Sequence, residues 1–395
     1  MPRSSDRLKS SQQEPTSKYL SFAKTAFSSL YRGLKAVAEN YYTPAESILL
    51  GLIAGYIILG YLAAGSVGHA QDVYLFVYSA GLWRFVYPVI AIAVTMRVIY
   101  IMVRIVPDRL FHYIAKDLKA IIFDRQRWYR VIPLTVMLTC FFSVFTSLKQ
   151  LIPAFNAYTW DQSWMLLDQY LHLGWHPWEL LQPFIGVPLI TYLLNVSYNI
   201  WFFVMLAFNL IQVFSLQDRL LRMQYFYTFV LIWAIGGNVL ASVFASAGPC
   251  YYDTFATGQN PYTGLMDYLQ VVNGKYEIWA LNAQQLLLDK QSAQGMGMGV
   301  GISAMPSMHV ATVTLFALQA MRTHRLFGFV MVLYAILIYL GSIHLAWHYA
   351  VDGIAGALIT ILTWYAVAHF LRKDRALHSI SQASGNTEAL EVRPA

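Results

Sequence analysis

Charged residues are scarce in this chain: they make up 12% of its 395 residues, whereas 57% of the residues are hydrophobic. A soluble globular protein carries roughly 25% charged residues, so this scarcity excludes an ordinary soluble domain. Cysteine is rare as well. Cys140 and Cys250 are the two cysteines, and they provide no disulfide framework. No apolar segment precedes Ser47, so we expect no cleavable secretion signal.

Long apolar runs are abundant instead, and runs of about 20 residues indicate membrane-spanning helices. Hydropathy and length predict an all-α polytopic membrane protein with about eight transmembrane helices. We place them at about 47–65, 80–103, 131–148, 187–213, 225–246, 306–321, 326–345 and 349–371.

Basic residues are distributed unevenly between alternate connections. The first 46 residues hold 7 Lys and Arg, the 104–130 connection 7, the C-terminal tail 4, and 214–224 and 322–325 hold 2 each. The connections on the other side of the predicted membrane hold only Lys149, Lys275 and Lys290. The positive-inside rule therefore predicts cytoplasmic termini. This topology accounts for the +7 net charge, so we do not expect nucleic-acid binding.

The spans suggest four regions. Residues 1–46 form a cytoplasmic basic tail, 47–130 two additional spans and a basic loop, 131–371 a six-helix catalytic membrane domain, and 372–395 a second cytoplasmic tail. Within the first tail, residues 19–38 are compatible with a surface helix or with a solvated segment. Two long outer loops, about 149–186 and 247–305, have the length of functional loops, and we expect them to cap a site.

Three residues with catalytic chemistry are predicted to meet at the outer face. His309 begins one apolar segment, and His348 and Asp352 begin another. Two intervening membrane passes return the chain to the face it left, so the three side chains should lie at similar depth. The spacing of four residues places His348 and Asp352 on one helix face. Such a cluster of ionisable groups at a membrane surface is more often functional than structural.

The chemistry of these residues fits reactions at phosphorus. His348, oriented by Asp352, can attack as a neutral imidazole, and His309 can protonate a leaving oxygen. Pro306 and Ser307 precede His309 at a helix start, where free N–H groups attract phosphate. A second reading is a metal site, because His344, His348 and Asp352 follow one another at fourth positions. The Pro306 helix start argues against that reading, and we expect no metal and no cofactor.

The segments PSMHVA and HYAVDGIAG resemble the second and third motifs of the type 2 phosphatidic acid phosphatase (PAP2) superfamily. The resemblance implies that His348 becomes phosphorylated, that Asp352 orients it, and that His309 acts as acid and then base. Two positions depart from the family pattern. Ser342 replaces the arginine of the third motif, and the first motif is not preserved after Lys149. A phosphomonoester would lack two guanidinium partners here, whereas a phosphodiester needs fewer.

One branch of the superfamily is similar to this chain over a wider region. It is the branch of the sphingolipid head-group transferases, which include inositol phosphorylceramide synthases. TWDQSWMLLDQYLHLGWHPW and SAGPCYYD resemble outer segments of its inositolphosphotransferase members. The resemblance implies a membrane enzyme that transfers a phospho-head group, phosphoinositol by analogy, from a glycerophospholipid to a lipid alcohol such as ceramide. Its partners would be membrane lipids. The alternatives are a lipid phosphate phosphatase of the same fold and, from another class, a transporter or flippase.

Six further residues are candidate substrate contacts near the predicted site. Each also has an ordinary structural role open to it, as a helix cap, a loop residue or a membrane-interface aromatic. These residues are Ser307, Ser342, His344, Lys149, Asp161 and Tyr252. The predicted topology puts the whole site on the periplasmic, extracellular or lumenal face of a multi-pass membrane protein.

Overall fold

The computed structural model describes residues 43–79, 81, 83–215, 218–292 and 299–391. This part of the chain is helical and contains no strand, which confirms the all-α fold. The predicted tail of residues 1–46 lies almost entirely outside the described residues, including the segment 19–38.

The α-helices in chain order are α3 (Pro44–Ser66), α4 (Trp83–Tyr100), α5 (Leu110–Ile122), α6 (Arg125–Gln150), α7 (Ile152–Phe155), α8 (Asp161–Leu171), α9 (Pro177–Ile185), α10 (Pro188–Phe214), α11 (Arg219–Leu231), α12 (Ala241–Val243), α13 (Tyr252–Phe255), α14 (Thr263–Asn273), α15 (Trp279–Ser292), α16 (Met308–Thr323), α17 (Arg325–His344) and α18 (Ala350–Glu391). Between them lie the 3-10 helices η1 (Ala70–Asp72) and η4 (Pro249–Tyr251) and the π-helices η2 (Ile101–Ile105) and η3 (Ile232–Leu240).

Seven helices of the described chain are long and apolar enough to cross a membrane, which confirms a multi-pass architecture. They are Pro44–Ser66, Val86–Ile105, Arg127–Gln150, Pro188–Phe214, Arg219–Val243, Arg325–His344 and Ala350–Lys373. Each matches a span predicted from hydropathy within a few residues.

The eighth predicted span, 306–321, corresponds to α16, which has the predicted length but is too short to count among these seven. Its 16 residues reach about 24 Å, against the ~30 Å of a bilayer core. Instead α16 occupies the interior of the bundle, packed along α17 and α18, with Leu315 and Phe316 fully buried. A helix enclosed by other helices and covered at its start does not need the length of a lipid-facing span.

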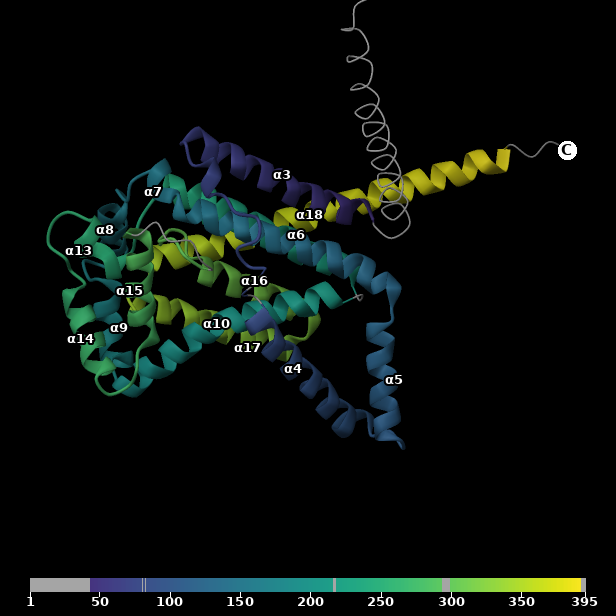
Figure 1. The fold of residues 1–395 in the computed structure, drawn as a ribbon, viewed down its shortest axis with the longest axis horizontal. Coiled ribbons are helices and arrows are strands. Elements are labelled where there is room, and N and C mark those ends of the chain that lie inside the picture. Colours follow the sequence, from purple (N-terminus) through teal and green to yellow (C-terminus); the bar gives the residue numbers. More distant parts are fainter. Residues whose placement is uncertain (1–42, 80, 82, 216–217, 293–298, 392–395) are drawn as a thin grey trace, which may run out of the picture.

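The two long loops fold into short helices that gather at one end of the bundle. Figure 1 shows α8, α9, α13, α14 and α15 together at the left, where α16 and α18 also begin. We refer to these five helices as the cap.

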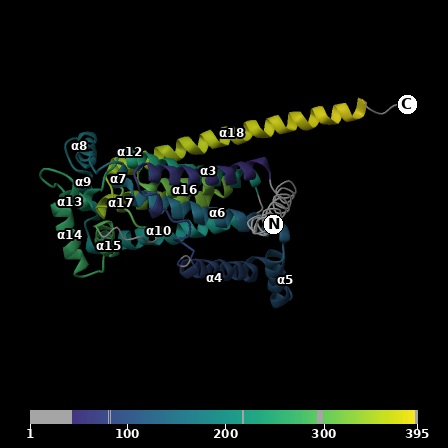
Figure 2. The same cartoon turned by 45° about the horizontal axis from the view of Figure 1, so that its top comes forward.

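The first span, α3, packs closely along α6. A Cβ atom on Gly60 would lie 2.7 Å from Val144 Cγ1, so the close approach depends on glycine. Tyr56 of α3 also donates a hydrogen bond to Asn238 of the π-helix η3. The following α4 contacts α10 at the edge of the bundle, and α5 stands apart from the bundle in both views (Figures 1 and 2).

Candidate active site

The starts of α16 and α18 lie side by side beneath the cap. The backbone N–H of Ser307 donates to the Asp352 carbonyl at 3.0 Å, which joins the two segments directly. The His309 and His348 rings consequently lie next to each other in an edge-on arrangement, with centroids 6.1 Å apart. The structure thus brings together His309, His348 and Asp352, which are up to 43 positions apart in the chain.

His348 contacts Asp352, but not along one helix face as the spacing predicted. Its Nδ1 lies 3.3 Å from Asp352 Oδ2, whereas α18 begins only at Ala350. The chain turns first. Ala346 is in the left-handed region with φ +60°, and the Ser342 carbonyl accepts hydrogen bonds from the backbone N–H groups of Trp347 and His348. The predicted contact is therefore correct and the predicted continuous helix is wrong.

The carboxylate of Asp352 has a second partner. Its Oδ2 accepts a 2.9 Å hydrogen bond from the Tyr349 backbone N–H, at the residue that precedes α18. Asp352 is fully buried. Because the same oxygen contacts the His348 ring and the chain segment that carries it, the carboxylate fixes the orientation of that ring.

The His309 ring is enclosed by aromatic side chains of α10. Its centroid lies 4.5 Å from the Tyr198 ring in a stacked arrangement and 4.1 Å from the Trp201 ring. Tyr198 also stacks at 6.4 Å on Trp347, the neighbour of His348. These contacts restrict rotation of the His309 ring and present it toward His348.

Two carboxylates of the cap helix α8 hold the backbone around the site. Asp168 accepts hydrogen bonds from the N–H groups of Ala350 and Val351, at 2.7 and 2.9 Å, and so caps the start of α18. Asp161, two helical turns earlier, accepts from the N–H groups of Ala247 and Gly248, both at 2.8 Å.

Burial and hydrogen bonding act in opposite directions on these two carboxyl groups. Burial raises the pKa of Asp168 to about 6, although the two backbone N–H groups favour its ionised form. Burial likewise raises the pKa of Asp161, against the N–H groups of Ala247 and Gly248. Tyr349, beside His348, adds a 2.9 Å hydrogen bond to Asp161. Both carboxylates are therefore directed at the protein backbone and not at solvent.

The family assignment rests on the same region. A family model described as the PAP2 superfamily matches residues 162–366, just over half of the chain. The chain belongs to the PAP2 superfamily. Membership points to a lipid phosphatase or phosphotransferase type of activity. A search of the curated proteins and a search of the solved structures each found no match to this chain.

Among the predicted substrate contacts of this PAP2 protein, Lys149 is the side chain best suited to bind phosphate, because it is a cation. It is in the last turn of α6, is half-buried, and is close enough to His309 and His348 for its charge to act on both. Ser307 caps α16, since its hydroxyl accepts from the Val310 N–H at 3.4 Å.

The other predicted contacts have partners within the protein. The Ser342 hydroxyl donates to the Tyr339 carbonyl at 2.7 Å, and Nε2 of His344 lies 2.8 Å from the Thr191 hydroxyl. Tyr252 is 1% exposed and packs against Tyr262 in the cap. Asp161 contacts backbone, as described above.

The alternative metal reading fails on geometry. His344 ends α17, His348 lies in the turn, and Asp352 is inside α18, so the three do not share a helix face. Within the described residues, no group of three or more His, Cys, Asp or Glu is placed to hold a metal ion.

Sequence reasoning missed the aromatic enclosure by Tyr198 and Trp201, because aromatic residues in an apolar span carry no distinguishing pattern. The role of Asp168 had a detectable signal. Asp161 and Asp168 are seven residues apart in an aromatic segment, the spacing that places two side chains on one helix face.

Proposed function

We propose that this PAP2 protein transfers a phospho-head group, phosphoinositol in the first instance, from a glycerophospholipid to a lipid alcohol such as ceramide. The observation that carries the proposal is the pairing of His348 with Asp352 opposite His309, with Lys149 as the neighbouring cation. The arginine of the family's third motif is replaced by Ser342, whose hydroxyl is bonded to the backbone.

The first step forms a covalent intermediate. Because Nδ1 of His348 faces Asp352, its Nε2 is the nitrogen that attacks phosphorus, and a P–N bond forms as the P–O bond to diacylglycerol breaks. His309 donates a proton to the departing diacylglycerol oxygen. Asp352 stabilises the positive charge that develops on the His348 ring.

The second step regenerates the enzyme. His309, now neutral, removes the proton from the acceptor hydroxyl, and the alkoxide oxygen attacks the phosphorus. A new P–O bond forms, the P–N bond to His348 breaks, and His309 is protonated again. Water in place of the lipid alcohol would give hydrolysis by the same steps.

The charge of the site favours a diester over a monoester. Lys149 and the N–H groups at the start of α16 can compensate a phosphodiester, which carries one negative charge. A dianionic monoester would require more cationic partners. The departure at Ser342 therefore supports head-group transfer over the phosphatase alternative.

The positions of the cap and of the basic residues also support an orientation of the protein in the membrane. Basic residues of α5 and of the α16–α17 turn lie away from the cap, since α16 starts at the site and runs to the other end. By the positive-inside rule we place the cap and the site on the non-cytoplasmic face.

The decisive assay uses purified protein in detergent with labelled ceramide and a panel of glycerophospholipids. It follows new phosphosphingolipid and free phosphate together, for the wild type and for His348→Ala. We expect a lipid product with one class of donor and no product from the variant. Free phosphate from a monoester, without a lipid product, would assign the protein to the phosphatases instead.

A further inference from the structure

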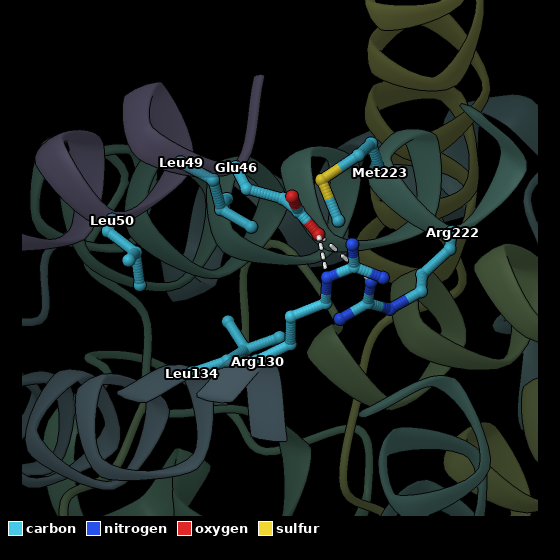
Figure 3. A pocket seen from close by; sticks show the side chains of 7 residues that line it. All are labelled: Glu46, Leu49, Leu50, Arg130, Leu134, Arg222 and Met223. Atoms are coloured by element: carbon cyan, nitrogen blue, oxygen red, sulfur yellow. Dashed lines mark hydrogen bonds and ion pairs between the residues drawn. The ribbon is translucent and has the colours of Figure 1, made fainter. Parts of the chain in front are cut away.

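A second cluster of buried charge lies at the far end of the bundle. Glu46, in the first turn of α3, contacts Arg219 and Arg222 of α11 and, at 3.8 Å, Arg130 of α6. Figure 3 shows Glu46 with Arg130 and Arg222. Arg130 and Lys149 are 19 residues apart on α6, or about 28 Å along its axis. The cluster is thus separate from the candidate active site by nearly a membrane thickness.

The single carboxylate is saturated by its donors. Oε1 of Glu46 contacts Arg222 Nη1 at 3.2 Å and Arg130. Oε2 accepts from the Thr43 N–H at 2.9 Å, from the Thr43 hydroxyl at 3.0 Å, and from Arg219. A carboxylate offers about four lone-pair positions, so Glu46 cannot accept from the remaining guanidinium N–H groups.

Donor capacity remains on Arg219. The Nε atom of Arg219 is buried and has no hydrogen-bond partner in the described structure. Arg222 is 3% exposed, and its Nε donates to the Gln212 carbonyl at 3.0 Å. Cations that exceed their paired carboxylates in a buried place are costly unless another anion compensates them. Arginine is well suited to phosphate, because its planar fork binds two oxygens at once.

The surroundings of the cluster suit a lipid. A small hollow of about 10 Å³, room for about one water molecule, is lined by the charged side chains Glu46, Arg130 and Arg222 and by the apolar side chains Leu49, Leu50, Leu134 and Met223. Arg130 and Arg219 are partly exposed, at 20% and 38%, so the cluster is open from outside. Further along α3, Ile58 and Leu62 are exposed in the apolar part of the span.

We propose that Arg219, with Arg130 beside it, binds the phosphate of an anionic phospholipid at the open edge of this cluster, and that the acyl chains lie along α3 and α6. The buried Arg222 adds its positive charge from behind. The arginines neutralise the head group, and the apolar lining continues into the bilayer. Basic pockets between transmembrane helices are known to recognise such head groups. This site does not depend on the proposed reaction. It would join the additional span α3 to α6 and α11.

The test measures binding to the purified full-length protein in detergent by native mass spectrometry. The probes are dioctanoyl phosphatidylglycerol, dioctanoyl phosphatidylcholine and inorganic phosphate. Arg219→Gln removes one ligand, and Arg325→Gln is the matched control, an exposed arginine at the start of α17 on the same end of the bundle. Thermal unfolding verifies that each variant is folded.

We expect the wild type and Arg325→Gln to bind phosphatidylglycerol equally, and Arg219→Gln to bind it about tenfold more weakly, the loss of one charge-assisted contact. Phosphatidylcholine and inorganic phosphate should bind weakly to all three proteins. Equal phosphatidylglycerol binding by Arg219→Gln and Arg325→Gln would overturn the site. Inorganic phosphate that binds as tightly as the lipid, and is lost in Arg219→Gln, would overturn the lipid as its occupant.

Discussion

The two ends of the helical bundle treat buried charge in opposite ways. Under the cap, Asp161 and Asp168 are each satisfied by two backbone N–H groups of their own protein. At the far end, three guanidinium groups share Glu46, and that carboxylate is already saturated. Backbone dipoles are fixed in place, so the capped carboxylates stabilise one geometry. Arg219 instead keeps a donor without a partner in the described structure, and we propose that it binds an external anion.

This difference separates positioning from recognition. The carboxylates of α8 hold the backbone at Ala247 and Gly248 and at the start of α18, directly after His348. The Glu46 cluster has more hydrogen-bond donors than its one carboxylate can accept. We therefore propose that this protein uses buried charge at one end to hold the candidate site and at the other to bind a ligand, so substitutions at the two ends should have distinct effects.

The largest expected effect is at the candidate nucleophile. His348→Ala removes the nitrogen that forms the P–N bond, so we expect turnover to fall at least ~10³-fold. A cooperative thermal unfolding transition shows whether the variant is folded. The assay is the two-product measurement with labelled ceramide. Unchanged turnover in a folded His348→Ala protein would contradict the proposed mechanism.

Asp168→Asn tests whether the cap positions the site. The amide cannot accept from two N–H groups as the carboxylate does, so the start of α18 should loosen and kcat should fall by about 10²-fold. KM should change much less, because Asp168 does not contact substrate. Asp267→Asn, an exposed carboxylate on cap helix α14, is the control. A matching loss in the control, or a change confined to KM, would argue against positioning.

Glu46→Gln tests the far end and should affect stability before activity. Removing the one carboxylate leaves buried guanidinium groups without their paired charge, at a cost of about 2–3 kcal/mol after allowance for the exposure of Arg219. The midpoint of thermal unfolding should therefore decrease. Glu277→Gln, exposed in the cap, should stay within about 0.5 kcal/mol of the wild type. Equal midpoints for the two variants would show that the cluster contributes no stability.

Lys149→Gln tests whether the positive charge at the candidate site contributes to catalysis. Its charge acts on both histidines, and loss of one charge-assisted phosphate contact should reduce kcat/KM about tenfold. Lys275→Gln, an exposed lysine that follows α14, should retain wild-type kinetics. If both variants behave alike, Lys149 has no special role in binding the phosphate.

The smallest effect is a pH dependence of stability. The pKa of Asp168 is about 6 in the folded protein, above the ~3.9 of an unfolded aspartate. The folded state then binds this proton more tightly, so the stabilising contribution is present below about pH 4 and is lost as the pH rises through 6. Between pH 5 and 7 the unfolding midpoint should decrease more steeply for the wild type than for Asp168→Asn. Parallel slopes would remove Asp168 as the titrating group.

The sequence by itself determined the helical membrane class and seven of the spans, because a bilayer requires long apolar helices whatever surrounds them. It also indicated which histidines and aspartate would meet, since two passes return the chain to one face. Tertiary structure decided what periodicity does not encode. The turn at Ala346 places His348 before α18, and enclosure by α17 and α18 allows α16 to be short. The Asp168 partners Ala350 and Val351 and the Glu46 partner Arg222 are more than 170 residues away, and such contacts depend on how the helices pack.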